Sequence, residues 1–119
     1  MEYLSSMLDE RGCPAAAKTQ LLIALDEVVS NVVRCSGATG IAIEMRFSQA
    51  PKGVTVVLSD DGKPFNPLHV PTPDTKGSAD ERPVGGLGIL LLRKTMDSLA
   101  YRYAHGCNIL TFQKRLDAV

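Results

Sequence analysis

Apolar residues in the first third of the chain recur at the spacing of two successive α-helices. A short first helix is expected to end near Gly12, because glycine stops a helix and Pro14 favours the start of the next one. From Pro14 a longer stripe with helical spacing continues to Val33, and Gly37 closes it. The members of this apolar stripe are Leu21, Leu22, Leu25, Val28, Val29, Val32 and Val33.

After Gly37 the pattern changes to strict alternation. Apolar residues at positions 41, 43, 45 and 47 are separated by more polar ones, which is the period of a half-buried β-strand. Pro51-Lys52-Gly53 is typical of a turn. Residues 54–59 return as a second strand, so this part of the chain predicts a β-hairpin.

A long segment without apolar periodicity follows the hairpin. Residues 62–83 are rich in proline, and a segment of this length in a small domain is usually a functional lid or disordered. We therefore expect a lid over about residues 63–84. Gly85-Gly86-Leu87-Gly88 then begins an apolar helix that is predicted to continue to about Ser98.

The last part of the chain predicts a second hairpin. Strands over residues 99–104 and 108–116 flank a turn at His105-Gly106, and alternation puts Leu110 and Phe112 on one face. The order of elements predicts an α+β fold, a two-layer α/β sandwich with helices on one face of a mainly antiparallel sheet. With 119 residues the chain is expected to be a single domain, residues 1–119.

Composition and charge narrow the classes of function. Lys and Arg together number 13, as do Asp and Glu, so there is no basic surplus of the kind that drives nucleic-acid binding. The longest apolar runs are far shorter than the roughly 20 residues that span a bilayer, and the N-terminus lacks the basic start of a signal peptide. The three cysteines and two histidines form no metal-ligand motif. We expect a cytoplasmic protein that binds neither nucleic acid nor membrane.

Three groups of residues are candidates for chemistry, and the first lies on the long helix. Glu27 and Asn31 are four residues apart, so a carboxylate and an amide project the same way, away from the apolar stripe. Mg²⁺ prefers oxygen ligands and takes only one or two from a protein, and a carboxylate suits a general base. The competing interpretation is an ordinary solvated helix face.

The second candidate is Asp60-Asp61-Gly62, at the end of a predicted strand. Asp-Gly after an alternating run indicates a turn, in which both acids would be solvated. A carboxylate at a strand end is also well placed to accept a hydrogen bond from the exocyclic amine of a purine. Gly62 would let the flat ring approach the backbone closely.

The third candidate is Gly85-Gly86-Leu87-Gly88, at a helix N-terminus. Free backbone N–H groups and the helix dipole favour an anion such as a phosphate there. The segment lacks the third glycine of the dinucleotide fingerprint and the Gly-Lys-Ser/Thr of a Walker P-loop. A glycine-rich hinge that allows close helix packing is an equally good interpretation.

Taken together and in this order, the three groups resemble the GHKL ATPases, the superfamily of histidine kinases, type II topoisomerases and mismatch-repair ATPases. Within it, the segments 60–67 (DDGKPFNP), 81–89 (ERPVGGLGI) and 106–111 (GCNILT) are similar to the RsbW/SpoIIAB-type anti-sigma-factor serine/threonine kinases. The resemblance covers about residues 24–116. It implies a Bergerat-type ATP-binding fold. The family usually has a strand before its first helix, and the expectation here is either a sheet that is one strand short or an N-terminus that has been lost or misassigned.

The resemblance also implies a role for each candidate residue. Glu27 would be the general base that activates a partner's serine hydroxyl, and Asn31 the magnesium ligand. Asp60 would bind adenine, with Gly62 against the ring and Thr111 supporting the adenine site through water. Contacts to the phosphates of ATP would come from the lid residue Arg82, which would alternatively meet the partner, and from Gly86, Leu87 and Gly88.

The function implied by the resemblance is that of an ATP- and Mg²⁺-dependent protein serine/threonine kinase. It would phosphorylate a STAS-domain anti-sigma antagonist in a partner-switching pathway that regulates transcription, and it would bind a sigma factor or a similar client. The alternative is a nucleotide-binding interaction module of the same fold without phosphotransfer activity. A homodimer is one expected form of either.

Overall fold

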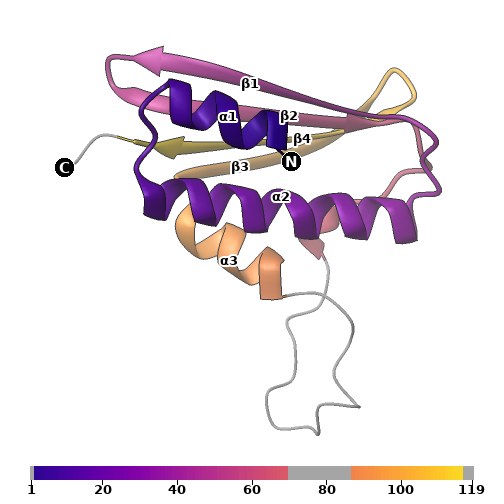
Figure 1. Ribbon diagram of the computed structural model, residues 1–119. Coiled ribbons are helices and arrows are strands. Elements are labelled where there is room, and N and C mark those ends of the chain that lie inside the picture. The colour runs from indigo at the N-terminus through magenta and orange to yellow at the C-terminus, as the bar shows by residue number, and fades with distance from the viewer. Residues whose placement is uncertain (1, 70–86, 117–119) are drawn as a thin grey trace, which may run out of the picture.

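The fold has two layers, a sheet of four antiparallel strands and a layer of helices on one of its faces (Figure 1). The computed structural model describes residues 2–69 and 87–116. The predicted α+β sandwich is confirmed. Its elements in chain order are α1 (Glu2–Glu10), α2 (Ala15–Cys35), β1 (Ile41–Gln49), β2 (Lys52–Asp60), the 3₁₀ helix η1 (Pro67–His69), α3 (Leu87–Thr95), β3 (Ser98–Ala104) and β4 (Cys107–Arg115).

The ends of the first two helices follow the signals in the sequence. Gly12, with φ +71°, turns the chain after α1, and Pro14 is the N-cap residue of α2. Ser36 caps the C-terminus of α2, and Gly37 leaves the helix with φ +69°. Both glycines take the left-handed conformation that other residues rarely adopt. The predicted helices and the positions where they stop are confirmed.

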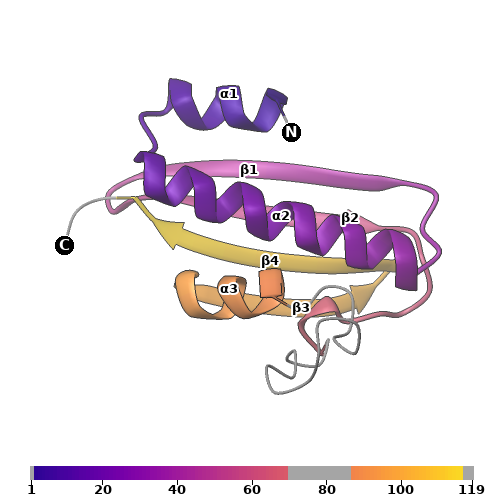
Figure 2. The same cartoon turned by 60° about the horizontal axis from the view of Figure 1, so that its bottom comes forward.

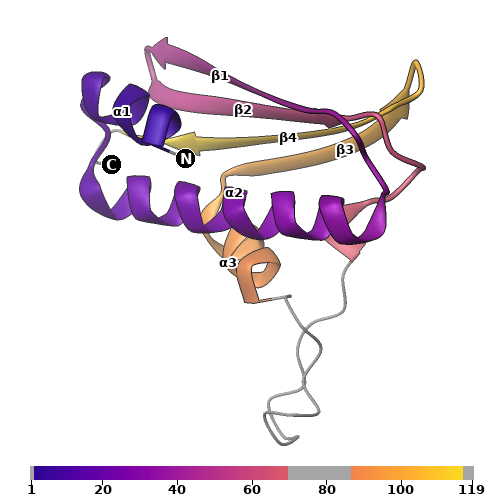
Figure 3. The ribbon, with the colours of Figure 1, turned by 45° about the vertical axis from the view of Figure 1, so that its right-hand side comes forward.

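The sheet has the strand order β1-β2-β4-β3, with every neighbouring pair antiparallel. Asp60, the last residue of β2, is paired with Ile41 at the start of β1 and with Asn108 near the start of β4. These three strand ends lie at the same end of the molecule as the C-terminus of α2 (Figure 3). The fold therefore joins the Asp-Asp-Gly segment to the end of the long helix.

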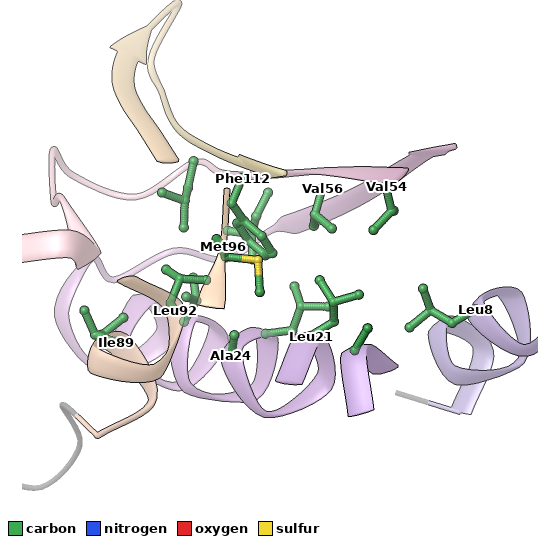
Figure 4. Close-up of a cluster of buried hydrophobic side chains, with 14 of the residues drawn as sticks. Leu8, Leu21, Ala24, Val54, Val56, Ile89, Leu92, Met96 and Phe112 are labelled. Atoms are coloured by element: carbon green, nitrogen blue, oxygen red, sulfur yellow. The ribbon is translucent and has the colours of Figure 1, made fainter. Parts of the chain in front are cut away.

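The space between the layers is filled by apolar side chains. Leu110 and Phe112 face the helices as predicted, and at 2% and 0% exposure both are buried. Each large apolar side chain removed from water in this way contributes about 1.5–3 kcal/mol to stability. Figure 4 shows Val54, Val56 and Phe112 of the sheet opposite Leu8, Leu21, Ala24, Ile89, Leu92 and Met96.

The buried face of α2 differs from the predicted apolar stripe. Val33 was expected in the stripe but is 57% exposed, whereas Ala24 and Asn31 are buried. The reason is that α3 packs beside α2 as well as against the sheet (Figure 2), which buries a flank of the helix that periodicity alone assigns to solvent. The expectation that Asn31 lies away from the buried side is therefore wrong.

The third helix and the lid also differ from the prediction. Helix α3 ends at Thr95 rather than near Ser98, because the following residues join the sheet. Asp97 donates its backbone N–H to the carbonyl of Gln113 at 2.8 Å and accepts the backbone N–H of Arg115 at 2.6 Å. Of the predicted lid, the described part up to residue 69 contains the short helix η1. The rest of the lid, with Arg82, lies outside the described residues, as does Gly86 at the predicted start of the helix.

Candidate functional site

Four buried polar residues of the described chain gather at one end of the sandwich. They lie on the last turns of α2, at the end of β2 and near the start of β4, and each is at most 3% exposed. Apolar residues fill the rest of the interior, so this polar end is distinct from the core. Its members are Asn31, Ser36, Asp60 and Asn108.

Asp60 has one carboxylate oxygen that is fully used and one that is not. Its Oδ1 accepts hydrogen bonds from the backbone N–H of Gly62 and from the side-chain Nδ2 of Asn108, both at 2.9 Å. Its Oδ2 is buried without a partner. A buried acceptor left unsatisfied costs about 1–3 kcal/mol. This oxygen is therefore an open position for a ligand that brings an N–H donor.

Asn108 holds Asp60 and the loop that follows it. Besides Asp60, its Nδ2 donates to the carbonyl of Lys63 at 2.8 Å. Its Oδ1 accepts the backbone N–H of Phe65 at 2.8 Å and the hydroxyl of Tyr101 on β3. One buried amide thus connects two strands to the segment that leads toward η1. Sequence reasoning missed this residue, although its alternation with Leu110 and Phe112 already put it on the buried face.

Thr111 does not reach Asp60. Thr111 lies three residues after Asn108 on β4, opposite Val57 of β2. Its neighbours Leu110 and Phe112 are the residues that face the helices. Because side chains alternate along a strand, Thr111 is on the other face of the sheet. Thr111 therefore faces away from the buried side of the sheet that holds Asp60, and the residue of β4 beside Asp60 is Asn108.

Gly62 is required by the close approach of its loop to the end of α2. A Cβ at this position would lie 2.4 Å from Oγ of Ser36 and 2.5 Å from its carbonyl oxygen. The same carbonyl accepts the backbone N–H of Lys63 at 2.9 Å. Ser36 in turn donates its hydroxyl to the carbonyl of Val32 at 2.8 Å. Packing against the helix end is thus a reason for glycine here, in addition to the expected contact with a ring.

Asp61 differs from the adjacent Asp60 in its exposure to solvent and in the hydrogen bonds that its carboxylate accepts. It is exposed and accepts hydrogen bonds from the backbone N–H of Gly40 at 3.0 Å and from the N–H and hydroxyl of Thr39, each at 2.8 Å. The bond from Gly40, followed by those from Thr39, lowers the pKa of the Asp61 carboxyl. Asp61 therefore anchors the loop between α2 and β1.

Asn31 faces a positive charge. Its Oδ1 accepts a hydrogen bond from Nη2 of Arg34, while its Nδ2 is buried without a partner. An amide oxygen is a suitable ligand for Mg²⁺, and here it already lies against a cationic group. A magnesium ion at this oxygen would take the place of the Arg34 guanidinium.

Glu27 lies against the start of α3. A Cβ on Gly88 would be 2.2 Å from Cβ of Glu27, so the glycine lets the two helices approach closely. The interpretation of Gly88 as a packing glycine is therefore correct, and its contact with phosphate stays a prediction. Leu87, the first residue of α3, stands beside it. Glu27 is half-buried and lies one helical turn from Asn31.

Comparison with known proteins identifies the family. The family model named histidine kinase-like ATPase domain matches residues 1–114. The chain belongs to the histidine kinase-like ATPase family. It is also 29% identical over 99 residues to the Serine/threonine-protein kinase BtrW of Bordetella bronchiseptica, an alignment that covers 82% of this chain and 70% of that protein. No solved structure matches the chain. The resemblance to the GHKL superfamily is confirmed.

The polar end of this ATPase domain fits the nucleotide that the family implies. The unpaired Oδ2 of Asp60 can accept the exocyclic amine of adenine, which is a hydrogen-bond donor. The oxygen of Asn31 can ligate a magnesium ion once Arg34 has moved. None of the helices within residues 2–69 and 87–116 is long and apolar enough to cross a membrane.

Proposed function

We propose that this ATPase domain is an ATP- and Mg²⁺-dependent protein serine/threonine kinase of the anti-sigma-factor type. Its substrate would be a serine of a STAS-domain anti-sigma antagonist. The observation that carries the proposal is the buried carboxylate of Asp60, which keeps one oxygen open at the same end of the fold as Asn31. The similarity to a protein named as a serine/threonine kinase supports a kinase-type activity.

Each residue has one task in this proposal. Asp60 accepts the adenine amine, and the oxygen of Asn31 holds the magnesium ion that neutralises phosphate charge. ATP supplies the γ-phosphoryl group. The serine oxygen of the partner forms the new bond to the γ-phosphorus, the bond to the β,γ-bridging oxygen breaks, and ADP leaves. Glu27 accepts the hydroxyl proton. Positioning and charge stabilisation account for most catalysis of this reaction type.

The proposal includes a switch between partners. The domain would bind a sigma factor or a similar client in the cytoplasm, and it would release this client on engaging the unphosphorylated antagonist. The support for this part is the similarity of residues 60–67 and 81–89 to anti-sigma-factor kinases.

The decisive experiment follows the γ-phosphate of labelled ATP into purified STAS domains from the same genome. We expect transfer by the wild type, and a loss of about 10²- to 10⁴-fold in the rate for Glu27→Gln, because that variant lacks the proton acceptor. ATP affinity should change little. Asp26→Asn, at the neighbouring exposed position of α2, is the matched control and should transfer normally.

Two results would contradict the proposal in different ways. ATP binding without label on any STAS domain would favour the nucleotide-binding module. Transfer by Glu27→Gln within a few-fold of the wild type would remove Glu27 from the catalytic residues.

A further inference from the structure

The hydrogen bonds around Asp60 leave its two oxygens with unequal capacity for a ligand. A carboxylate oxygen has two lone-pair positions. On Oδ1 both are taken, by the N–H of Gly62 and by Nδ2 of Asn108, each at 2.9 Å. On Oδ2 both are open, and the atom is buried. A ligand can therefore place a donor on one oxygen only.

We propose that Asn108, oriented by Tyr101, is a positioning residue that makes the Asp60 site select adenine over guanine; the inference rests on the proposed binding of ATP. Asn108 acts through Asp60 by occupying Oδ1. The site is thereby restricted to bases that offer a single donor to the carboxylate.

The two purines differ in the donors that they present on this edge. Adenine has one exocyclic amine next to a ring nitrogen that only accepts. Guanine has a ring N–H and an exocyclic amine side by side, and the pair matches both oxygens of a free carboxylate at once. With Oδ1 of Asp60 already saturated, one guanine donor would be buried without an acceptor, which costs affinity.

The amide of Asn108 has only one favourable orientation. Its Oδ1 accepts the N–H of Phe65 at 2.8 Å and the hydroxyl of Tyr101. A flipped amide would set this oxygen against the carboxylate of Asp60 and the carbonyl of Lys63, which are both acceptors. It would also set the amide N–H₂ against the N–H of Phe65. The contacts of Tyr101 and Phe65 therefore ensure that Asn108 presents a donor to Asp60.

The test is the ratio of ATP to GTP affinity, measured by calorimetry with Mg²⁺ on the full chain. The wild type should prefer ATP. In Asn108→Ala, Oδ1 of Asp60 becomes free to accept the second guanine donor, and the preference should fall by about tenfold. Tyr101→Phe removes the orienting hydroxyl and should lower the preference in the same direction by less. Tyr103→Phe is the matched control, because Tyr103 lies on the same strand and is 45% exposed.

The outcomes separate this inference from the proposed function. If the wild type binds neither nucleotide, the proposed function fails and the inference fails with it. If the wild type binds ATP and GTP equally, or if both variants keep the wild-type ratio within about twofold, the inference is overturned while ATP binding stands. If Asn108→Ala does not fold, Tyr101→Phe decides. If the variants lose thermal stability but keep the wild-type ratio of ATP to GTP affinity, the role of Asn108 is only structural and the inference is overturned.

Discussion

The apolar middle of the sandwich and its polar end lie on the same strands and the same face of the sheet, but they contribute to stability in opposite directions. Leu58 and Leu110, in the middle, are at most 2% exposed and stabilise the fold by leaving water. Two residues away on each strand, toward the same end of the sheet, Asp60 and Asn108 are also buried, at 2% and 3% exposure, but polar. Asp60 keeps an oxygen without a partner, at a cost in stability. Stability and ligand binding are thus separated along the strands.

The largest effect on stability is expected in the middle. Leu25 of α2 is fully buried, so Leu25→Ala should lower the free energy of unfolding by about 2–5 kcal/mol through lost burial and a residual cavity. Urea denaturation measures this change. The matched control is Ile23→Ala on the same helix, where 49% exposure predicts a much smaller loss. Equal losses in both variants would contradict this assignment of the core.

A substitution at the polar end should change stability little and should strongly reduce ligand binding. Asn31→Ala loses the hydrogen bond from Arg34 to Oδ1 but also removes a buried Nδ2 that has no partner, so the two effects offset each other and the free energy of unfolding should change by less than about 1 kcal/mol. Magnesium-dependent ATP binding should be lost, because the variant lacks the proposed ligand oxygen. Calorimetry with and without Mg²⁺ measures this loss. Unchanged affinity would rule out Asn31 as the magnesium ligand.

The smallest effect concerns Asp61, the exposed neighbour of Asp60. Hydrogen bonds from Gly40 and Thr39 hold the pKa of its carboxyl below the ordinary value of 3.8. A lowered folded-state pKa stabilises the protein above the unfolded value, and this contribution disappears as the pH falls through the folded value. The wild type should therefore lose more stability between pH 5 and about pH 3 than Asp61→Asn does.

Urea denaturation at the two pH values measures the difference for Asp61, and Asp26→Asn on α2 serves as the control for removing an exposed acid. ATP affinity should be nearly unchanged in Asp61→Asn, since its oxygens are already bound to the loop. A strong loss of ATP binding in Asp61→Asn would contradict the assignment of Asp60 to the ligand and of Asp61 to the loop between α2 and β1.

The sequence by itself determined the elements and the main candidate residue. Helices and strands appear in the chain as periods of 3.6 and 2, and glycines such as Gly12 and Gly37 mark the ends of helices, so these signals depend only on near neighbours. Asp60 was identified in the same way, since a strand followed by Asp-Gly is a local pattern. The resemblance to the GHKL superfamily rested on the order of such local motifs.

Only the tertiary structure decided which residues surround Asp60. Alternation within β4 already puts Thr111 on the other face, but the register between β2 and β4 puts Asn108 beside Asp60, and a strand's own sequence does not specify its partner's register. The packing of α3 on α2 likewise gives Gly88 its contact with Glu27, and Asn31 is buried although its helix periodicity put it off the apolar stripe. These contacts join residues far apart in the chain, and they depend on how whole elements pack. Periodicity within one element carries no information about that packing.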